Sequence, residues 1–142
     1  MKNKHLFLLA IILVCSYTAF AQDTSLFEKK ELIVKGDTLP YRMLYPENFD
    51  TEKTYPLILF LHGAGERGND NQKQLTHGSV LFLDQNNRTK FPAIVIMPQC
   101  PKDDYWAQVN VDRSNYPVQL DFQFKKGPTK AMGLGLQLLE NH

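Results

Sequence analysis

The residues best suited to chemistry lie in one glycine-rich loop. The run LILFLHGAGERGNDN, residues 57 to 71, changes abruptly from apolar to glycine-rich and charged. Three functions fit such a loop after a strand: a phosphate cradle, a set of backbone N–H groups that stabilises an oxyanion, or a turn without chemistry. Each of these functions makes a different demand on the surrounding sequence.

The phosphate cradle rests on GAGERG, residues 63 to 68, which satisfies G-x-G-x-x-G. A dinucleotide site also needs a helix that begins at the third glycine, and an acidic residue at the end of the next strand. The next apolar run ends in Ile96-Met97-Pro98-Gln99, without an acid. We therefore expect no nucleotide and no other cofactor.

Oxyanion stabilisation needs backbone N–H groups that point into one small volume. Glycines allow the main chain to turn tightly enough at the end of a strand to produce this arrangement. His62 would then orient the loop through its ring nitrogens instead of acting as the base. A purely structural histidine is the alternative, and the two interpretations nearly coincide. A turn without chemistry is the alternative for the loop as a whole.

Four strands are expected around this loop. Phe27 to Val34 and Leu39 to Tyr45 are rich in β-branched, aromatic and aliphatic residues and flank Gly36-Asp37, which suits a hairpin turn. Tyr55 to Leu61 and Ala93 to Met97 are apolar runs typical of strands that are covered on both faces. About thirty residues separate these two runs, enough for the crossover that a parallel pair requires.

Helices are expected in two places. Gln72 to Leu83 suits a short helix, although Gly78 weakens the pattern. Thr129 to Asn141 has apolar residues at the spacing of an amphipathic helix. Between them, the stretch PQCPKDDYWAQVNVDRSNYP, residues 98 to 117, has no sustained period and is predicted to be a loop.

The N-terminal residues are predicted to be a cleavable export signal. Lys2 and Lys4 precede an apolar stretch that is too short to span a bilayer, and Ala19-Phe20-Ala21 matches an A-x-A-like cleavage site. The chain then divides into a signal peptide, residues 1–21, and a single domain, residues 22–142. We expect an exported protein, periplasmic or extracellular, without a membrane anchor after cleavage.

Charge and composition exclude several classes of partner. The chain has 16 Lys and Arg against 15 Asp and Glu, and residues 1–21 contain two of the lysines and no acid. A nearly neutral surface without blocks of like charge predicts no nucleic-acid partner. Only Cys100 would remain after cleavage, so no disulfide framework is expected. His62 and His77 have no partner at a ligand spacing, so no metal site is expected.

The order of these segments resembles the N-terminal half of an α/β-hydrolase. Two antiparallel strands are followed by YPLILFLHGAGERG, by FPAIVIMPQCP and by Tyr105-Trp106. The segments are similar to exported bacterial carboxylesterases of the phospholipase/carboxylesterase group, near their feruloyl-esterase-like and predicted-peptidase-like relatives. The resemblance begins near Leu39, and Tyr55 to Gly68 gives it most of its specificity. It implies an incomplete α/β sheet in which Tyr55 to Leu61 is an unpaired, apolar edge.

The resemblance implies a serine hydrolase with a two-part oxyanion hole. The loop after the third strand supplies one N–H group, and the residue after the nucleophilic serine supplies the other. In this sequence the loop donor would be the N–H of Ala64, with Gly65 as the alternative. Trp106 would line the substrate cleft or pack in the core. The residues expected to support the loop are His62, Gly63, Glu66, Arg67 and Gly68.

The nucleophile of such an enzyme is missing from this sequence. No G-x-S-x-G occurs in the 142 residues, and Ser25, Ser79 and Ser114 do not lie at a strand-to-helix elbow. We therefore expect an N-terminal portion of a carboxylesterase that lacks nucleophile, acid and base and is inactive by itself. The expected substrate is a small acyl or aryl ester, with polysaccharide-linked esters among the candidates. A peptidase on the same scaffold and a non-catalytic secreted binding domain are the alternatives.

Overall fold

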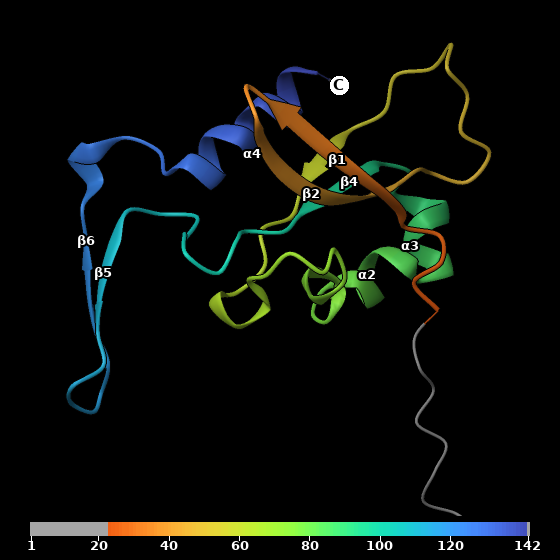
Figure 1. Cartoon of the computed structure of the whole chain (residues 1–142). Coiled ribbons are helices and arrows are strands. Elements are labelled where there is room, and N and C mark those ends of the chain that lie inside the picture. Colours follow the sequence, from red (N-terminus) through yellow and green to blue (C-terminus); the bar gives the residue numbers. More distant parts are fainter. Residues whose placement is uncertain (1–22, 142) are drawn as a thin grey trace, which may run out of the picture.

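The computed structural model describes residues 23–141, which form a four-stranded sheet, a two-stranded hairpin and several short helices (Figure 1). The predicted export signal, residues 1–21, lies outside the described residues. Within residues 23–141, no helix has the length and apolar character needed to cross a membrane.

The main sheet has the strand order β1-β2-β4-β3. Strands β1 (Glu28–Val34) and β2 (Asp37–Leu44) form an antiparallel pair, joined by Lys35 and Gly36, which both have positive φ angles. Two consecutive positive φ angles are typical of the turn that matches the twist of a hairpin. Strand β2 pairs antiparallel with β4 (Ile94–Pro98). The sheet is therefore mixed, as the sequence predicts.

Strand β3 (Leu57–Leu59) pairs in parallel with β4 and lies at the edge of the sheet. Its position agrees with the expected edge, but the prediction of a strand from Tyr55 to Leu61 was too long. Hydrogen bonds outside the strand extend the pairing by one residue at each end, from Ile94 N to Pro56 O and from Phe60 N to Ile96 O, both 2.9 Å. An apolar run predicts burial, whereas strand length depends on how many residues find a partner.

Alternation along β2 and β4 produces one core on each face of the sheet. One face packs against α4 (Lys130–Glu140), and the buried residues there are Leu39, Tyr41, Met43, Ile96, Leu134 and Leu138. The other face holds a second buried cluster, made of Phe27, Leu44, Leu75, Val95 and Met97. In Figure 1, α4 and the green helices α2 and α3 lie on opposite sides of the sheet.

Helix α4 confirms the helix predicted at Thr129 to Asn141. Thr129 is its N-cap, and its hydroxyl accepts a hydrogen bond from Met132 N at 3.1 Å. Leu134 and Leu138 are buried four residues apart, which is the spacing of one helix face. Leu136 belongs to the predicted apolar pattern but is exposed.

The prediction of a short helix within Gln72 to Leu83 was right only for its C-terminal part. The segment forms a 3-10 turn, η2 (Lys73–Leu75), then a break at Gly78, and then α2 (Ser79–Leu83). Gly78 has φ +89°, outside the α-helical region, so the helix cannot run through it, and a Cβ there would lie 2.4 Å from Phe60 Cζ. A further helix, α3 (Gln85–Lys90), follows directly.

The prediction of a loop for residues 98–117 was also wrong in part. Strand β5 (Val109–Asp112) begins there and pairs antiparallel with β6 (Gln119–Phe122), and a 3-10 turn, η3 (Phe124–Lys126), follows. Apolar and polar residues alternate along both strands. Four residues of alternation are too few to distinguish a short strand from a loop in a sequence.

Candidate functional site

The glycine-rich loop follows β3 and, after residues 60–63, forms a short 3-10 helix, η1 (Ala64–Glu66). Gly63 is extended, with φ −73° and ψ 170°, and Glu66 N donates to its carbonyl at 3.2 Å. The N–H groups of Ala64 and Gly65 precede this first donor, so the turn offers no acceptor for either of them. These are the two groups that the sequence singled out as oxyanion donors.

His62 links the start of the loop to the end of β4. Its ring is buried, with Nδ1 2.7 Å from Gly63 O and Nε2 2.9 Å from Cys100 N. Because a backbone N–H can only donate, Nε2 is the acceptor and the ring proton lies on Nδ1, where it donates to Gly63 O. Burial lowers the pKa of His62. Both nitrogens are thus occupied in the neutral ring, which leaves neither to act as a base.

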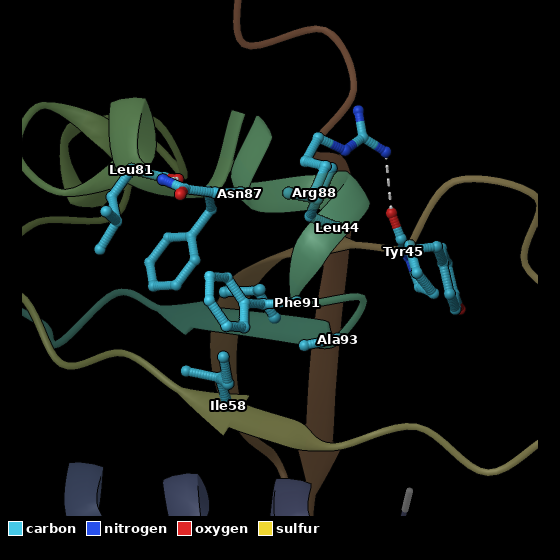
Figure 2. A pocket seen from close by; sticks show the side chains of 11 residues that line it. Leu44, Tyr45, Ile58, Leu81, Asn87, Arg88, Phe91 and Ala93 are labelled. Carbon is cyan, nitrogen blue, oxygen red and sulfur yellow. Dashed lines mark hydrogen bonds between the residues drawn. The ribbon is translucent and has the colours of Figure 1, made fainter. Parts of the chain in front are cut away.

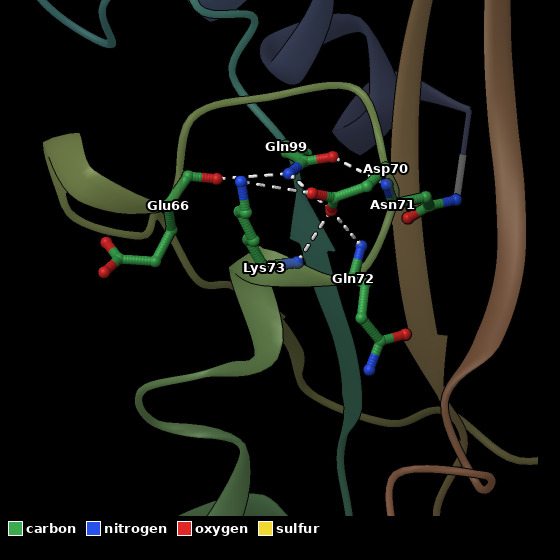
Figure 3. A network of polar contacts seen from close by, with 6 residues as sticks. All are labelled: Glu66, Asp70, Asn71, Gln72, Lys73 and Gln99. Atoms are coloured by element: carbon green, nitrogen blue, oxygen red, sulfur yellow. Dashed lines mark hydrogen bonds and ion pairs between the residues drawn. The ribbon is translucent and has the colours of Figure 1, made fainter.

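Gln99 is the buried centre of a polar network under the loop (Figure 3). Its Oε1 accepts from Asn71 N at 2.7 Å, and its Nε2 donates to Glu66 O at 3.1 Å and to Asp70 Oδ1 at 3.0 Å. A single side chain at the end of β4 therefore fixes both halves of the loop. Nothing in the sequence marks this residue beyond its place after a buried strand.

Asp70 completes the network on the side of η2. Its Oδ1 accepts from Lys73 N at 2.9 Å and from Gln72 N at 2.8 Å. The hydrogen bond from Lys73 N is the largest cause that lowers the pKa of Asp70 to about 2, and the contact with Gln99 adds to it. The carboxylate is therefore ionised at neutral pH and acts as an acceptor only.

Arg42, a residue of β2, binds the C-terminal end of the glycine-rich loop. Its Nε donates to Asn71 O at 2.6 Å, one terminal nitrogen donates to Phe27 O at 2.8 Å, and the other donates to Gln72 Oε1. Burial lowers the pKa of Arg42. The guanidinium satisfies its donors on uncharged oxygens and so binds the loop backbone to the strand. No pattern in the sequence predicted a role for Arg42 either.

The three glycines of GAGERG have different surroundings. A Cβ at Gly63 would lie 2.9 Å from Glu66 Oε2, and one at Gly68 would lie 3.0 Å from Gln99 Nε2. A Cβ at Gly65 would have no heavy atom within 4 Å. The first and third glycines therefore permit close packing under the loop, while the space over the second is open.

Arg67 joins the loop to the segment that carries Tyr105. Its Nε donates to Ala64 O at 2.9 Å, and one terminal nitrogen donates to the carbonyls of Lys102 and Asp104, at 3.0 and 2.9 Å. The guanidinium lies 3.8 Å from the centre of the Tyr105 ring, a cation–π distance. Glu66 points elsewhere, and its Oε1 is 3.5 Å from His77 Nε2.

Helix α4 anchors the same segment from the other side. Thr129 Oγ1 donates to Tyr105 O at 2.6 Å, and Ala131 N donates to Asp104 Oδ2 at 2.8 Å. The segment that Arg67 contacts is therefore itself fixed to the core helix.

An apolar groove of about 390 Å³ begins at Gly63 and Ala64 and continues to the β5–β6 hairpin. Trp106 lines it and also packs on the core beneath α4, with its ring 5.4 Å from that of His62. Its Nε1 is buried and has no hydrogen-bond partner among residues 23–141, so packing alone holds the indole. Trp106 thus packs against the core and also lines this groove.

A second pocket, of about 240 Å³, lies on the other face of the sheet and includes Ile58 of β3 (Figure 2). Most of its lining is apolar. Arg88 turns away from it to donate to Tyr45 O at 3.1 Å, as the dashed line in Figure 2 shows. No residue of the glycine-rich segment 62–68 lines this pocket, whereas Gly63 and Ala64 line the groove, so the groove is the better candidate for chemistry.

The serines, histidines and acids of the described residues do not assemble a catalytic group at the groove. No serine lines it, and Ser79 is buried in α2, where its hydroxyl donates to Leu75 O. Within residues 23–141, no three His, Cys, Asp or Glu side chains are grouped as metal ligands would be. Cys100 is buried, and burial raises the pKa of its thiol to about 12.

Comparison with known proteins supports a hydrolase fold. The chain is similar to the crystal structure of a thermostable esterase, with a TM-score of 0.68 and 29% sequence identity over 83% of this chain. The match spans 30% of the length of that esterase. No protein-family model and no curated protein matches the sequence. The mixed sheet and this likeness together are consistent with a partial α/β fold of hydrolase type.

Proposed function

We propose that this chain supplies the oxyanion-hole loop of an exported serine hydrolase that cleaves small acyl or aryl esters. The nucleophile, acid and base of that enzyme lie outside these 142 residues, and the chain has no esterase activity by itself. The observation that supports the proposal is that Ala64 lines one end of a groove, in a turn that offers no acceptor to the N–H groups of Ala64 and Gly65, while the loop behind it is tied to the sheet. The likeness to an esterase supports the reaction class.

The chemistry of ester cleavage explains why such a loop is built rigidly. The carbonyl oxygen becomes an anion in the tetrahedral intermediate, and donors that are already in place require no reorganisation when the charge develops. Gln99, His62 and Arg67 hold the backbone on either side of the two N–H groups. His62 has no free nitrogen, so its part is to position the loop.

A proline substitution can remove one donor with little disturbance of the turn. Position 64 is the first residue of η1, where proline is tolerated, and Gly63 already has the extended backbone that precedes a proline. Ala64→Pro therefore deletes the N–H group at this position. Gly65→Ala is the matched control, because it keeps its N–H and enters open space.

The proposal is tested in a chimera in which residues 23–141 replace the superposed part of the thermostable esterase. We expect hydrolysis of phenyl acetate by the chimera, a kcat about 100-fold lower with Ala64→Pro and an unchanged KM. Gly65→Ala should change kcat by less than about threefold, well within 1 kcal/mol. An unchanged kcat in both Ala64→Pro and Gly65→Pro chimeras would show that the loop holds no oxyanion.

A further inference from the structure

We propose that the β5–β6 hairpin and Trp106 form the binding wall for a bulky apolar arm, aryl or alkyl, of the ester whose carbonyl faces Ala64. This inference rests on the proposed function and adds the class of substrate. The hairpin takes no part in the proposed stabilisation of the oxyanion, so substrate binding gives it a separate role.

The hairpin has one apolar face and one polar face. In its register, Val109 lies opposite Phe122 and Val111 lies opposite Leu120. These four residues all line the groove. The alternating pairs, Asn110 with Asp121 and Asp112 with Gln119, are polar and are absent from the groove. The apolar pairs therefore form a continuous surface on the side that faces the loop.

The fold leaves much of this apolar surface uncovered. Leu120 is 56% exposed and Phe122 is 44% exposed, although both lie in a paired strand. Figure 1 shows the hairpin standing away from the main sheet, connected to it at one end. A contiguous exposed apolar patch on a small protein marks a binding surface.

The shape and position of the groove indicate a small ligand. Its volume of about 390 Å³ falls within the ~300–1,000 Å³ of small-molecule sites. One end is formed by Gly63 and Ala64, so an ester with its carbonyl at the loop would extend its arm along the hairpin. The charged residues that line the groove are Arg67 and Arg113, and no carboxylate lines it. Uncharged or anionic arms fit this lining, and cationic arms do not.

Trp106 provides a direct readout because it is the only tryptophan of the chain. The full chain would be titrated with ethyl 4-phenylbutanoate, with ethyl acetate and with ethyl 4-aminobutanoate, and its fluorescence recorded. We expect a saturable change for the phenyl ester, with a dissociation constant on the order of 1 mM. No saturation is expected for the other two esters at ten times the concentration.

Two lysine substitutions on the same strand provide the matched comparison. Leu120→Lys places a charge on the apolar face and should weaken binding of the phenyl ester at least tenfold. Gln119→Lys adds the same charge on the opposite face, next to Asp112, and should leave binding unchanged. Equal binding by the two variants, or no saturable signal in the native chain, would overturn the proposal.

Two further outcomes separate this proposal from its alternatives. Saturable binding of the phenyl ester by the native chain together with a failed chimera test would reject the oxyanion role and keep the groove as the binding site. A fluorescence signal that follows protein concentration without ester, with a dimer that Leu120→Lys dissociates in sedimentation velocity, would identify a self-association face and reject the ester arm.

Discussion

The glycine-rich loop and the β5–β6 hairpin line the same groove but are held in different ways. The loop is tied by Gln99 and Arg42, which come from distant parts of the chain, and by its own His62, which accepts from Cys100 N. The hairpin relies on pairing between its own strands, and at its base Gln123 N donates to Gln108 O at 2.8 Å. The side with the N–H donors is therefore fixed by the fold, and the apolar side is largely independent of it.

This difference fits two kinds of recognition. Stabilising a developing charge requires donors that do not move during the reaction. Binding an apolar arm is proportional to the area removed from water and has little directional demand. Within one groove, the rigid loop can thus stabilise the charge, and the more independent hairpin can bind the apolar arm.

A substitution of Gln99 should show most strongly that the loop is anchored to the fold and the hairpin is not. Gln99→Leu removes three hydrogen bonds and leaves the buried Asn71 N–H without its acceptor, so we expect the free energy of unfolding to fall by about 3 kcal/mol. The matched change in the hairpin, Gln119→Leu, should stay within about 0.5 kcal/mol of the native chain. Urea denaturation measures both variants. Equal effects would mean that the network does not hold the loop.

Two glycines with positive φ angles should differ in the packing around them. Gly78, with φ +89°, would place a Cβ 2.4 Å from Phe60 Cζ, whereas Gly127, with φ +74° beyond the hairpin, has open space. We expect Gly78→Ala to lower the free energy of unfolding by about 2 kcal/mol or more, from strain and overpacking together. Gly127→Ala should lose about 1 kcal/mol, from strain alone. A larger loss at Gly127 would contradict the contrast between a packed body and an open hairpin.

The pH dependence of stability should come from His62, at the start of the glycine-rich loop. Burial lowers the pKa of His62, so the folded chain binds fewer protons than the unfolded chain, and this contribution to stability is lost as pH falls below about 6.5. Protonation would also remove the acceptor for Cys100 N. We expect urea midpoints to decline from pH 7 to pH 5.5, and to decline less in His62→Gln. A decline in His62→Gln as steep as that of the native chain would assign the effect to another group.

The smallest effect is expected on the apolar face of the hairpin. Leu120 is mostly exposed, so Leu120→Ala should change the free energy of unfolding by less than about 0.5 kcal/mol. Thermal melts followed by circular dichroism test this value. A loss of more than about 2 kcal/mol, as for a buried leucine, would mean that the hairpin is part of the core.

The sequence predicted those parts of the fold that are determined by neighbouring residues. The antiparallel strands, the parallel crossover and α4 follow from alternation, turn residues and helical spacing. Gly78 marked the weak point of the predicted helix, whereas the close approach of the Phe60 ring to this glycine could not be inferred from the sequence. The hairpin was missed because its strands are only four residues long.

The residues of the candidate site also differ in whether the sequence alone could identify them. The loop with Ala64 and Gly65 was recognisable because its glycines follow an apolar run directly. Gln99 and Arg42 were not, because their partners are mostly backbone groups that only the folded chain brings near. A polar side chain that binds backbone leaves no spacing pattern in the sequence.

The most direct test of the central claim follows the backbone amides of the loop in the full chain. Phenylphosphonate, an anion that mimics the tetrahedral intermediate, would be titrated into ¹⁵N-labelled protein. The account predicts that the amide signals of Ala64 and Gly65 move together, while that of Gly68, whose N–H already donates to Cys100 O at 2.9 Å, stays in place. Unmoved Ala64 and Gly65 signals at saturating anion would contradict it.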